Sequence, residues 1–481
     1  MTPEEFRSAA HELVDWLTDR RISIEERRVL PEVKPGDIAA QFPVDPPIGG
    51  DDSSAVLADL EQLIAPGITE VQHPMNFGWF PSNASLSSIL GDFASSGLSA
   101  LGISWESAPS LTEVEEVVVD WLRQLTGLGD EWSGVIQDTA STSCLVALIA
   151  ARERATDHAQ TSGGLVGFGR RLHVYTTDEA HSSVRKGALL AGFGAADMRI
   201  VDVDPWTRDM DIEHLRALMD ADVAAGGVPA AVVALSGSTG VTAFDQLDEV
   251  IEASHIHRAW VHVDAAMAGA ALLLPEQRHL FDGIDQADSI SWNPHKWMGT
   301  ILDTSLLYLR DPEILIRVMS TNPGYLRSTG GGGEATQFRD WGIPLGRRFR
   351  ALKLWYQLRV DGPDEIRTRL RRDLDNARWF AAEVAQLDGW EIVAPTRLQT
   401  VCVQHRPATV APDDREALSA HNLAWVRSIN SSGNAFLSPS LLDDQWIARI
   451  SIGVEATERH HLESLLALME QHAAAVTSQA S

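Results

Sequence analysis

Short apolar runs alternate with longer amphipathic stretches through the central part of the chain. The runs are rich in β-branched residues, and each is followed by a stretch in which apolar positions recur with helical spacing. They cover residues 134–137, 172–176, 230–235, 259–264 and 289–292. This alternation over residues 133–310 predicts a mainly parallel sheet with helices on both faces.

The pattern is different at the N-terminus. Between Glu4 and Arg20 the apolar residues fall on one stripe of a predicted helix, which comprises Phe6, Leu13, Val14, Trp16 and Leu17. Proline-rich connectors follow at residues 30–36 and 42–47. The stripe needs a surface that covers it, and the pattern fits a second subunit as well as the chain's own domain.

The C-terminal part combines helices with a few short strands. Helices are predicted over residues 351–385, 413–431 and 458–476, and strands over 390–393, 400–403 and 447–452. These elements indicate a small α/β domain that closes the chain.

Composition narrows the class of protein. A chain of 481 residues is long enough for two or three domains. Its net charge of −28 argues against nucleic acid or an anionic membrane as a partner. Cys144 and Cys402 suit neither a disulfide framework nor a metal site, so we expect no metal. The chain has no apolar run long enough for a membrane span and no signal peptide at its start, so we expect it to be cytoplasmic.

The stretch Ser291–Met298 contains a lysine with unusual neighbours. Lysine is rare in this chain, which has only Lys34, Lys186, Lys296 and Lys353. Lysine offers a primary amine that desolvation can neutralise, so that it becomes a nucleophile able to form a Schiff base, whereas arginine does not. Lys296 has Trp292 and Trp297 nearby and follows a turn proline. The alternative is a lysine at a strand end whose stem lies along apolar surface.

Other reactive groups follow the predicted strands. Asp264 ends one strand, where a buried carboxylate is costly unless a cation or a donor meets it. His181 follows another strand, and small hydroxyl residues at 138–143 precede a predicted helix. Because ligands bind at the carboxyl ends of strands in open α/β sheets, these groups and Lys296 can share one edge. Taken singly, the 138–143 segment also fits a helix cap, and His181 fits a satisfied polar residue.

An imine-forming lysine, a buried aspartate, an imidazole and an anion cradle together suit pyridoxal phosphate (PLP). The aspartate pairs with the ring nitrogen, the lysine carries the cofactor, and the helix start holds the phosphate. The sequence has no G-x-G-x-x-G or Walker A segment that opens a helix, so nothing supports a dinucleotide or P-loop site.

These motifs resemble the group II PLP-dependent amino-acid decarboxylases, and the chain is most similar to the aromatic L-amino acid decarboxylases. The similarity covers nearly the whole chain. The shared segments are Asn293–Trp297, His262–Ala266, Asp178–Ser183, Gly134–Gln137 with Ala140 and Ser141, His73–Pro74 with Phe80–Ser82, and Pro344–Arg350. Several independent motifs in the same order make the resemblance specific.

The resemblance implies PLP fold type I with three domains. These are an N-terminal helical arm for dimerisation at 1–85, a large PLP-binding domain at 86–360 with a mainly parallel sheet of the seven-stranded type, and a small C-terminal α/β domain at 361–481. It also implies an obligate homodimer with active sites at the interface, in which residues 101–105 of one subunit wall the substrate pocket of the other.

The resemblance also assigns roles to single residues. Lys296 carries PLP, Asp264 pairs with the ring nitrogen and His181 stacks on the ring. Further cofactor contacts are expected from Ala266, Ala140, Ser141, Thr239, Asn293 and His295. Substrate contacts are expected from Trp79, Phe80, Pro81, Ser82, Ile103 and Gly346.

The reaction depends on the glycine-rich segment after Tyr325, which is typical of a mobile lid or of a merely flexible loop. In the resembled family a tyrosine at this point protonates the carbon that loses CO₂, and relatives with phenylalanine there tend to be aldehyde synthases. We therefore expect decarboxylation of tryptophan, 5-hydroxytryptophan, DOPA, tyrosine or phenylalanine to the amine, with a slight preference for indole substrates from Gly346. The alternatives are an aromatic aldehyde synthase, a decarboxylase of a non-aromatic amino acid, an aminotransferase and a catalytically silent binding protein.

The chain departs from the family pattern at several positions. Trp79 and Met267 each replace a tyrosine, and Asn76 replaces an aromatic residue. Asp138 places an acid in the phosphate turn, which is unfavourable unless its carboxylate points away from the phosphate. Phosphate contacts beyond Ala140 and Ser141 are therefore not assigned.

Overall fold

The computed structural model describes residues 1–320, 335–411 and 413–480 and divides the chain into two compact units. The first unit contains residues 1–81, 382–391 and 403–481, and the second contains residues 82–381 and 392–402. The N-terminal segment and most of the C-terminal region thus belong to the same unit. The expected division into three domains stays a prediction.

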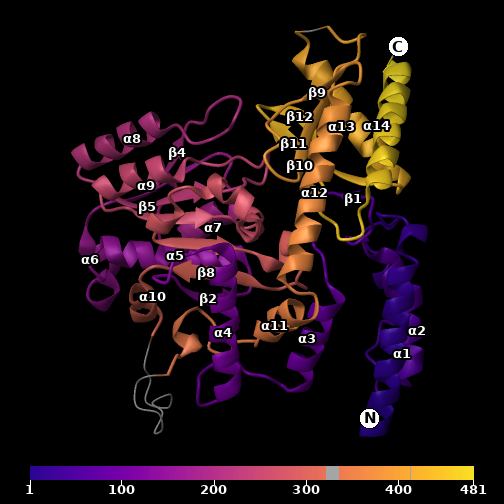
Figure 1. Ribbon diagram of the computed structural model, residues 1–481, viewed down its shortest axis with the longest axis horizontal. Coiled ribbons are helices and arrows are strands. Elements are labelled where there is room, and N and C mark those ends of the chain that lie inside the picture. The colour runs from indigo at the N-terminus through magenta and orange to yellow at the C-terminus, as the bar shows by residue number, and fades with distance from the viewer. Residues whose placement is uncertain (321–334, 412, 481) are drawn as a thin grey trace. The chain divides into compact units, whose positions relative to one another are not determined.

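The second unit is built on a seven-stranded sheet with the order β2-β8-β7-β6-β5-β3-β4 (Figure 1). The strands are β2 (Ser133–Gln137), β3 (Leu172–Thr177), β4 (Met198–Val201), β5 (Val228–Leu235), β6 (Trp260–Asp264), β7 (Ser289–Trp292) and β8 (Ser305–Leu309). Neighbours from β4 to β7 pair in parallel, whereas β8 is antiparallel to both β7 and β2. The expected mainly parallel seven-stranded sheet is confirmed, with one strand reversed.

Helices cover this sheet on both faces. The helices of the second unit are α3 (Leu86–Gly97), α4 (Pro109–Thr126), α5 (Ala140–Ala155), α6 (Gly164–Phe168), α7 (Ser182–Leu190), α8 (Ile212–Ala224), α9 (Leu247–Ile256), α10 (Pro312–Met319) and α11 (Ala351–Val360), and α12 (Pro363–Val384) begins in it. Ala231 and Val233 of β5 lie in one buried cluster with residues of α5 and α7. Because side chains alternate along a strand, Val232 points to the opposite face, and α8 and α9 also contact β5.

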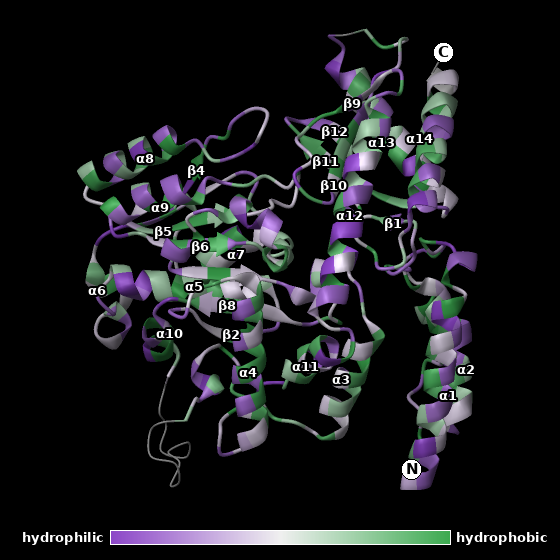
Figure 2. Ribbon diagram, viewed as in Figure 1, coloured by the Kyte–Doolittle hydropathy of each residue, from purple (hydrophilic) through white to green (hydrophobic). Residues whose placement is uncertain are grey.

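Burial on both faces explains the continuous apolar runs of the central strands. In Figure 2 β5 and β6 are mostly hydrophobic, while α4 alternates hydrophobic and hydrophilic residues along its length. Val135, Val174, Val232 and Val263 are all fully buried. Burying one such side chain contributes about 1.5–3 kcal/mol relative to leaving it in water.

A buried ion pair fixes the segment that precedes α11 to α4. Glu115 is fully buried, and the Arg347 guanidinium contacts both of its carboxylate oxygens. Arg347 also donates to the Ile136 carbonyl at 2.5 Å and lies 5.0 Å from the centre of the Phe338 ring. The pair therefore joins α4, β2 and the Pro344–Arg350 segment that the sequence marks as a shared motif.

The first unit contains α1 (Pro3–Ile22), α2 (Ser53–Asp59), α13 (Arg415–Ser432) and α14 (Arg459–Ala480). Its strands are β1 (Asn76–Phe77), β11 (Phe436–Leu442) and β12 (Gln445–Ser451), together with two of the three residues of β9 (Trp390–Ile392) and half of β10 (Thr400–His405). They form a five-stranded sheet with the order β1-β11-β12-β10-β9. α13 packs on β11, β12 and α14.

The predicted N-terminal helix is confirmed, and its apolar stripe is exposed. α1 begins with a capping box between Thr2 and Glu5, and none of its residues is buried. Phe6, Val14 and Leu17 have exposed fractions of 52%, 50% and 44%. Within the described residues, the chain's own domain therefore leaves most of the stripe exposed, while Trp16 is half-buried. No helix in the described residues combines the length and the apolar character that a membrane crossing requires.

Candidate active site

The predicted strand-end residues lie at one edge of the seven-stranded sheet. Asp264 is the last residue of β6 and pairs in register with Ser291 of β7, which leads to Lys296. His181 follows β3, which is parallel to β5 and hence to β6. Because both β2 and β7 are antiparallel to β8, the helix that follows β2 starts at the same edge. The topology thus brings these groups to one place.

Lys296 lies in the short segment Pro294–Met298 after β7, at a kink where its own backbone is not helical (φ −98°, ψ −113°). Its backbone N–H donates to the Asn293 carbonyl at 3.0 Å, and its side chain is half-buried. Trp292 and Trp297 on either side are fully buried, and the Trp297 indole N–H donates to Asp373 at 3.0 Å. The two buried tryptophans therefore anchor the segment on either side of the less buried Lys296.

Asp264 is buried, with an exposed fraction of 8%. Its Oδ1 accepts the backbone N–H of Ala266 at 3.1 Å, and Ala266 itself is half-buried just beyond the strand. Burial and, after it, the negative charge of Asp264 raise the pKa of the Cys144 thiol in the first turns of α5. The carboxylate thus lies close enough to α5 to act on it.

His181 caps the N-terminus of α7. Its Nδ1 accepts the backbone N–H of Ser183 at 3.2 Å and lies 2.7 Å from the Ser183 hydroxyl. Burial lowers the pKa of His181, Asp264 raises it and Lys296 lowers it further. Asp264 and Lys296 are therefore both within electrostatic reach of His181, which is neutral at physiological pH with its proton on Nε2.

The start of α5 combines a helix cap with an acidic residue. Thr139 is the N-cap, and its hydroxyl accepts the backbone N–H of Thr142 at 3.5 Å, so the capping interpretation is confirmed for this residue. Asp138 Oδ1 accepts the Thr139 N–H at 2.6 Å, so this carboxylate oxygen points towards the neighbouring backbone. Ala140 is buried and Ser141 is exposed. The positive end of the helix remains suited to a phosphate at these two residues.

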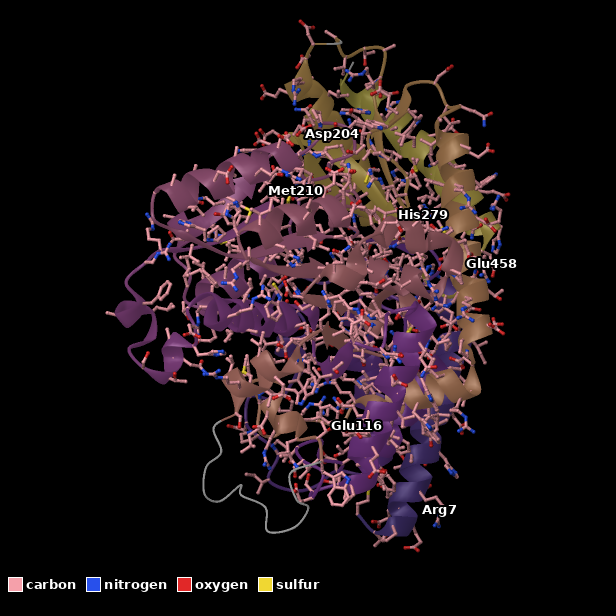
Figure 3. All side chains as sticks on the ribbon, turned by 60° about the vertical axis from the view of Figure 1, so that its left-hand side comes forward. Arg7, Glu116, Asp204, Met210, His279 and Glu458 are labelled. Atoms are coloured by element: carbon pink, nitrogen blue, oxygen red, sulfur yellow. The ribbon has the colours of Figure 1, made fainter. Side chains whose placement is uncertain are left out.

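Thr239 lies in a loop between β5 and α9 that a buried aspartate stabilises. Asp245 accepts the backbone N–H of Leu235 at 2.7 Å and of Met210 at 2.8 Å, and Met210 is labelled in Figure 3. Burial raises the pKa of Asp245 to about 7 despite these two donors. The loop closes on itself through the Ser238 hydroxyl, which accepts the Ala243 N–H at 3.0 Å.

Asn293 and His295 flank the turn that carries Lys296, and both are buried. His295 Nδ1 accepts the backbone N–H of Thr304 at 2.9 Å. Burial and the charge of Lys296 lower the pKa of His295 to about 4, so the ring is neutral and carries its proton on Nε2. Asn293 Oδ1 has no hydrogen-bond partner among the described residues.

These residues fit PLP. An amine, a buried carboxylate, a neutral imidazole and a helix N-terminus lie at one sheet edge, which is the set of groups that this cofactor uses. Unsatisfied buried polar atoms are rare, yet Asn293 Oδ1, Ser236 Oγ and Thr242 Oγ1 lack partners within the described chain. Asn293 directly follows β7 and Ser236 directly follows β5, at the sheet edge that carries Lys296.

The expected substrate residues are divided between the two units, with Trp79, Phe80 and Pro81 in the first. Trp79 is 55% exposed at a φ of +51°, and its ring meets the edge of Phe436 at a centroid distance of 4.8 Å. Arg449 donates to the Trp79 carbonyl at 2.6 Å and lies 4.1 Å from the centre of the Phe80 ring. The loop is thus fixed with its indole exposed.

The other substrate residues, Ser82, Ile103 and Gly346, belong to the second unit. Gly102 N–H donates to the Arg347 carbonyl at 2.9 Å, so the loop with Ile103 lies beside the segment with Gly346. Gly346 is exposed, and a Cβ added there would meet no atom within 4 Å. Tyr325 and the glycine-rich segment lie outside the described residues.

The sequence analysis assigned no role to two buried residues, His262 in the second unit and Arg449 in the first. His262 is fully buried between the hydroxyls of Ser289, at 2.8 Å from Nδ1, and Ser291, at 3.3 Å from Nε2. It lies two residues before Asp264 on the same strand, so the two-residue period of a strand places both on one face. This two-residue period was the sequence signal that could have identified His262. Arg449, far away in sequence, gave none.

One group of possible metal ligands occurs in the described chain, formed by Glu25, His460 and His461. His461 Nδ1 accepts the backbone N–H of Glu458 at 2.9 Å, which places the ring proton on Nε2. Nε2 lies 3.5 Å from Glu25. A protonated nitrogen cannot ligate a metal, so the arrangement is that of a histidine–carboxylate contact.

Comparison with known proteins agrees with this geometry. The pyridoxal-dependent decarboxylase conserved domain matches residues 35–406. Tryptophan decarboxylase 2 of Oryza sativa subsp. japonica is 34% identical over 99% of this chain and 96% of its own length. Tyrosine decarboxylase 2 of Narcissus pseudonarcissus is 35% identical over 98% and 95%, and phenylacetaldehyde synthase of Arabidopsis thaliana is 34% identical over 98% and 96%.

The fold matches solved structures equally well. The crystal structure of Oryza sativa TDC with PLP and tryptamine superposes with a TM-score of 0.95 at 34% identity, over 98% of both chains. That structure contains the cofactor that the residues at the sheet edge suit.

Proposed function

Because this chain belongs to the family of pyridoxal-dependent decarboxylases, we propose that it decarboxylates an aromatic L-amino acid to the corresponding amine and CO₂. The candidate substrates are tryptophan, 5-hydroxytryptophan, DOPA, tyrosine and phenylalanine. The observation that carries the proposal is similarity over nearly the full length of relatives named for tryptophan and tyrosine, together with Lys296, Asp264 and His181 at one sheet edge.

Each residue of this set has a separate task. When bound, PLP supplies an electron sink for the charge left on Cα after CO₂ departs. With PLP bound, Asp264 would hold a proton on the ring nitrogen, and the Lys296 amine would anchor the cofactor. The neutral His181 ring supplies a flat surface for the cofactor ring. Tyr325 delivers the proton to Cα.

The substrate loop supports an aromatic side chain better than an acidic one. Trp79 exposes its indole, whereas the cation at this loop, Arg449, is 3% exposed and already contacts the Trp79 carbonyl and the Phe80 ring. Residues 74–82 contain no lysine or arginine. Within this loop, a carboxylate on the substrate side chain would thus find no basic partner other than Arg449.

The experiment that tests the proposal measures CO₂ and amine release from a panel of L-amino acids with the PLP-loaded enzyme. We expect the highest kcat/KM for an aromatic member and little turnover of glutamate or of aliphatic amino acids. A non-aromatic amino acid with the highest kcat/KM would refute the substrate class.

Tyr325→Phe separates amine formation from aldehyde synthesis, the activity for which one of the relatives is named. Loss of the phenol removes the proton donor, so we expect amine release to fall by about 10²-fold or more while PLP binding is unchanged. The amine and the aldehyde are quantified together, with hydrogen peroxide as the marker of oxidation. Unchanged amine formation would remove Tyr325 from the mechanism.

We also propose that the chain is a homodimer whose active sites lie at the interface. The support is the exposed stripe of α1, with Phe6, Leu13, Val14 and Leu17 between 41% and 52% exposed, and a second exposed apolar row on α3, formed by Leu86, Leu90 and Phe93. Exposed rows of large apolar side chains such as these are typical of an interface. The cytoplasmic location stays a prediction.

Leu13→Asp tests the dimer. A charge in the middle of the stripe has to be desolvated in an interface, so we expect the dimer to weaken by about 10²-fold or more, with a monomer visible by sedimentation velocity. Ser8→Asp introduces the same charge on the opposite side of α1, where Ser8 is exposed, and is expected to leave the dimer intact. Equal sedimentation of both variants as dimers would argue against α1 as an interface.

A further inference from the structure

Lys353 on α11 is a fully buried lysine for which the proposed reaction has no task. Its Nζ donates to the carbonyl oxygens of Leu302 and Asp303, each at 3.2 Å. Two carboxylates also face it, Asp92 Oδ1 at 3.3 Å and Asp303 Oδ1 at 3.6 Å. Burying an ammonium group is costly unless acceptors surround it, so this lysine is committed to the 302–303 backbone.

The same backbone is held from a second side. Arg350 donates to Asp303 through Nε at 3.1 Å and Nη2 at 2.9 Å. Burial opposes ionisation of Asp303, but Arg350 and then Lys353 outweigh it and hold the pKa of this carboxyl at about 2. α3, which carries Asp92, packs beside α11, which carries Lys353 (Figure 1). The 302–303 backbone is therefore a rigid point of the second unit.

This rigid point leads directly to the active-site turn. The residue after Asp303 is Thr304, whose N–H donates to His295 Nδ1 at 2.9 Å, and the Thr304 hydroxyl donates to the Asp303 carbonyl at 2.7 Å. The charged groups that act on His295 are Lys296, Asp303 and Lys353. A ring whose Nδ1 accepts a backbone N–H keeps its own proton on Nε2.

We propose that Lys353 is a positioning residue for His295 and hence for the turn that carries Lys296. It holds the carbonyls of Leu302 and Asp303 so that the Thr304 N–H stays on His295 Nδ1. The imidazole is thereby kept as a neutral Nε2–H donor next to the cofactor lysine. The inference rests on the proposed function only in that PLP is bound at Lys296, and it does not depend on the substrate.

The test is a double-mutant cycle on cofactor affinity. The PLP dissociation constants of the full-length apoenzyme, Lys353→Met, His295→Gln and the double variant are measured by titration without substrate, followed by cofactor absorbance. We expect each single variant to raise the dissociation constant about tenfold, as loss of a charged or buried hydrogen bond does. The double variant is expected to be no weaker than His295→Gln, because both changes act through one contact.

Two controls separate positioning from general stability. Lys353→Arg keeps a cation with donors and is expected to stay within about threefold of the wild type, since it can still reach the two carbonyls. Lys34→Met removes an exposed lysine and is expected to change nothing. If Lys353→Met does not fold, as judged by thermal unfolding, Arg350→Gln takes its place, because it loosens Asp303 from the other side. We expect Arg350→Gln to lower PLP affinity less than Lys353→Met would. This loss should again vanish in the His295→Gln background.

The pH dependence gives a readout that a purely structural role would not move. In the wild type His295 is neutral, so it contributes no step to PLP affinity near pH 6.5. In Lys353→Met the pKa of His295 is expected to rise above about 4, because a cation that lowers it is lost while burial and Lys296 remain. The pH profile then gains a step at higher pH that the double variant lacks. Additive losses in the cycle, or the same pH profile in all variants, would overturn the proposal. Failure on aromatic substrates would refute the proposed function and leave this result standing.

Discussion

Replacing Lys296 with alanine is expected to lower the rate of CO₂ release by about 10³-fold or more and to abolish the absorbance of a lysine–PLP Schiff base. Of the four lysines, Lys34 and Lys186 are exposed on the surface, and Lys353 is fully buried against two carbonyls. Lys296 alone is half-buried at the strand ends, and its charge acts on His181. Lys296 is therefore the lysine that we assign to the cofactor.

Reduction with borohydride followed by peptide mass mapping identifies the lysine directly. We expect the added cofactor mass on the peptide that contains Lys296 and on no other. Lys186→Ala removes an exposed lysine of α7 and serves as the matched control, with wild-type absorbance and rate. Cofactor mass on Lys186 or Lys353, or a normal absorbance in Lys296→Ala, would show that the wrong lysine has been assigned.

The parallel sheet could be predicted because its central strands are buried on both faces. β5 and β6 therefore appear in the sequence as continuous apolar runs. β4 could not be found in this way, since it is an edge strand in which Ile200 is 51% exposed. The reversed direction of β8 has no local signal either, because a strand has the same pattern of side chains in both directions.

The site residues that lie at or shortly after the ends of strands could be predicted from the sequence. Lys296, Asp264 and His181 all directly follow or end strands, and parallel strands end at the same edge. Contacts between distant segments could not be predicted. Arg449 meets the Trp79 carbonyl across 370 residues of sequence, and Lys353 reaches the Asp303 carbonyl across 50. Their roles depend on tertiary packing, which leaves no periodic pattern.

The N-terminal helix is a second case in which the sequence predicted an element but not its contacts. Its apolar stripe predicted a helix correctly but could not decide which surface covers it. The structure shows that α1 has no buried residue in the single chain, which leaves the second subunit as the partner that we propose. Local pattern thus gives the element, while the covering surface depends on what lies outside the segment.

Asp264→Asn is expected to lower kcat by about 10³-fold while the fold persists. The amide has the same size as the carboxylate, and its oxygen can still accept the Ala266 N–H, which lies 3.1 Å from Oδ1. What the variant loses is the negative charge that we propose keeps the cofactor's ring nitrogen protonated, and in a buried site such a charge is worth several kcal/mol of transition-state stabilisation. The rate is measured as CO₂ release at saturating PLP.

Asp264→Glu distinguishes charge from packing at this site. It keeps the charge and displaces it by one methylene, so we expect a rate between those of the wild type and Asp264→Asn, with a similar thermal unfolding midpoint for all three proteins. If Asp264→Asn and Asp264→Glu lost stability and PLP affinity together but kept kcat, Asp264 would be only a structural acceptor for Ala266. A loss of kcat that follows the charge would instead assign Asp264 to the ring nitrogen, because the hydrogen bond to Ala266 is available to Asn as well as to Asp.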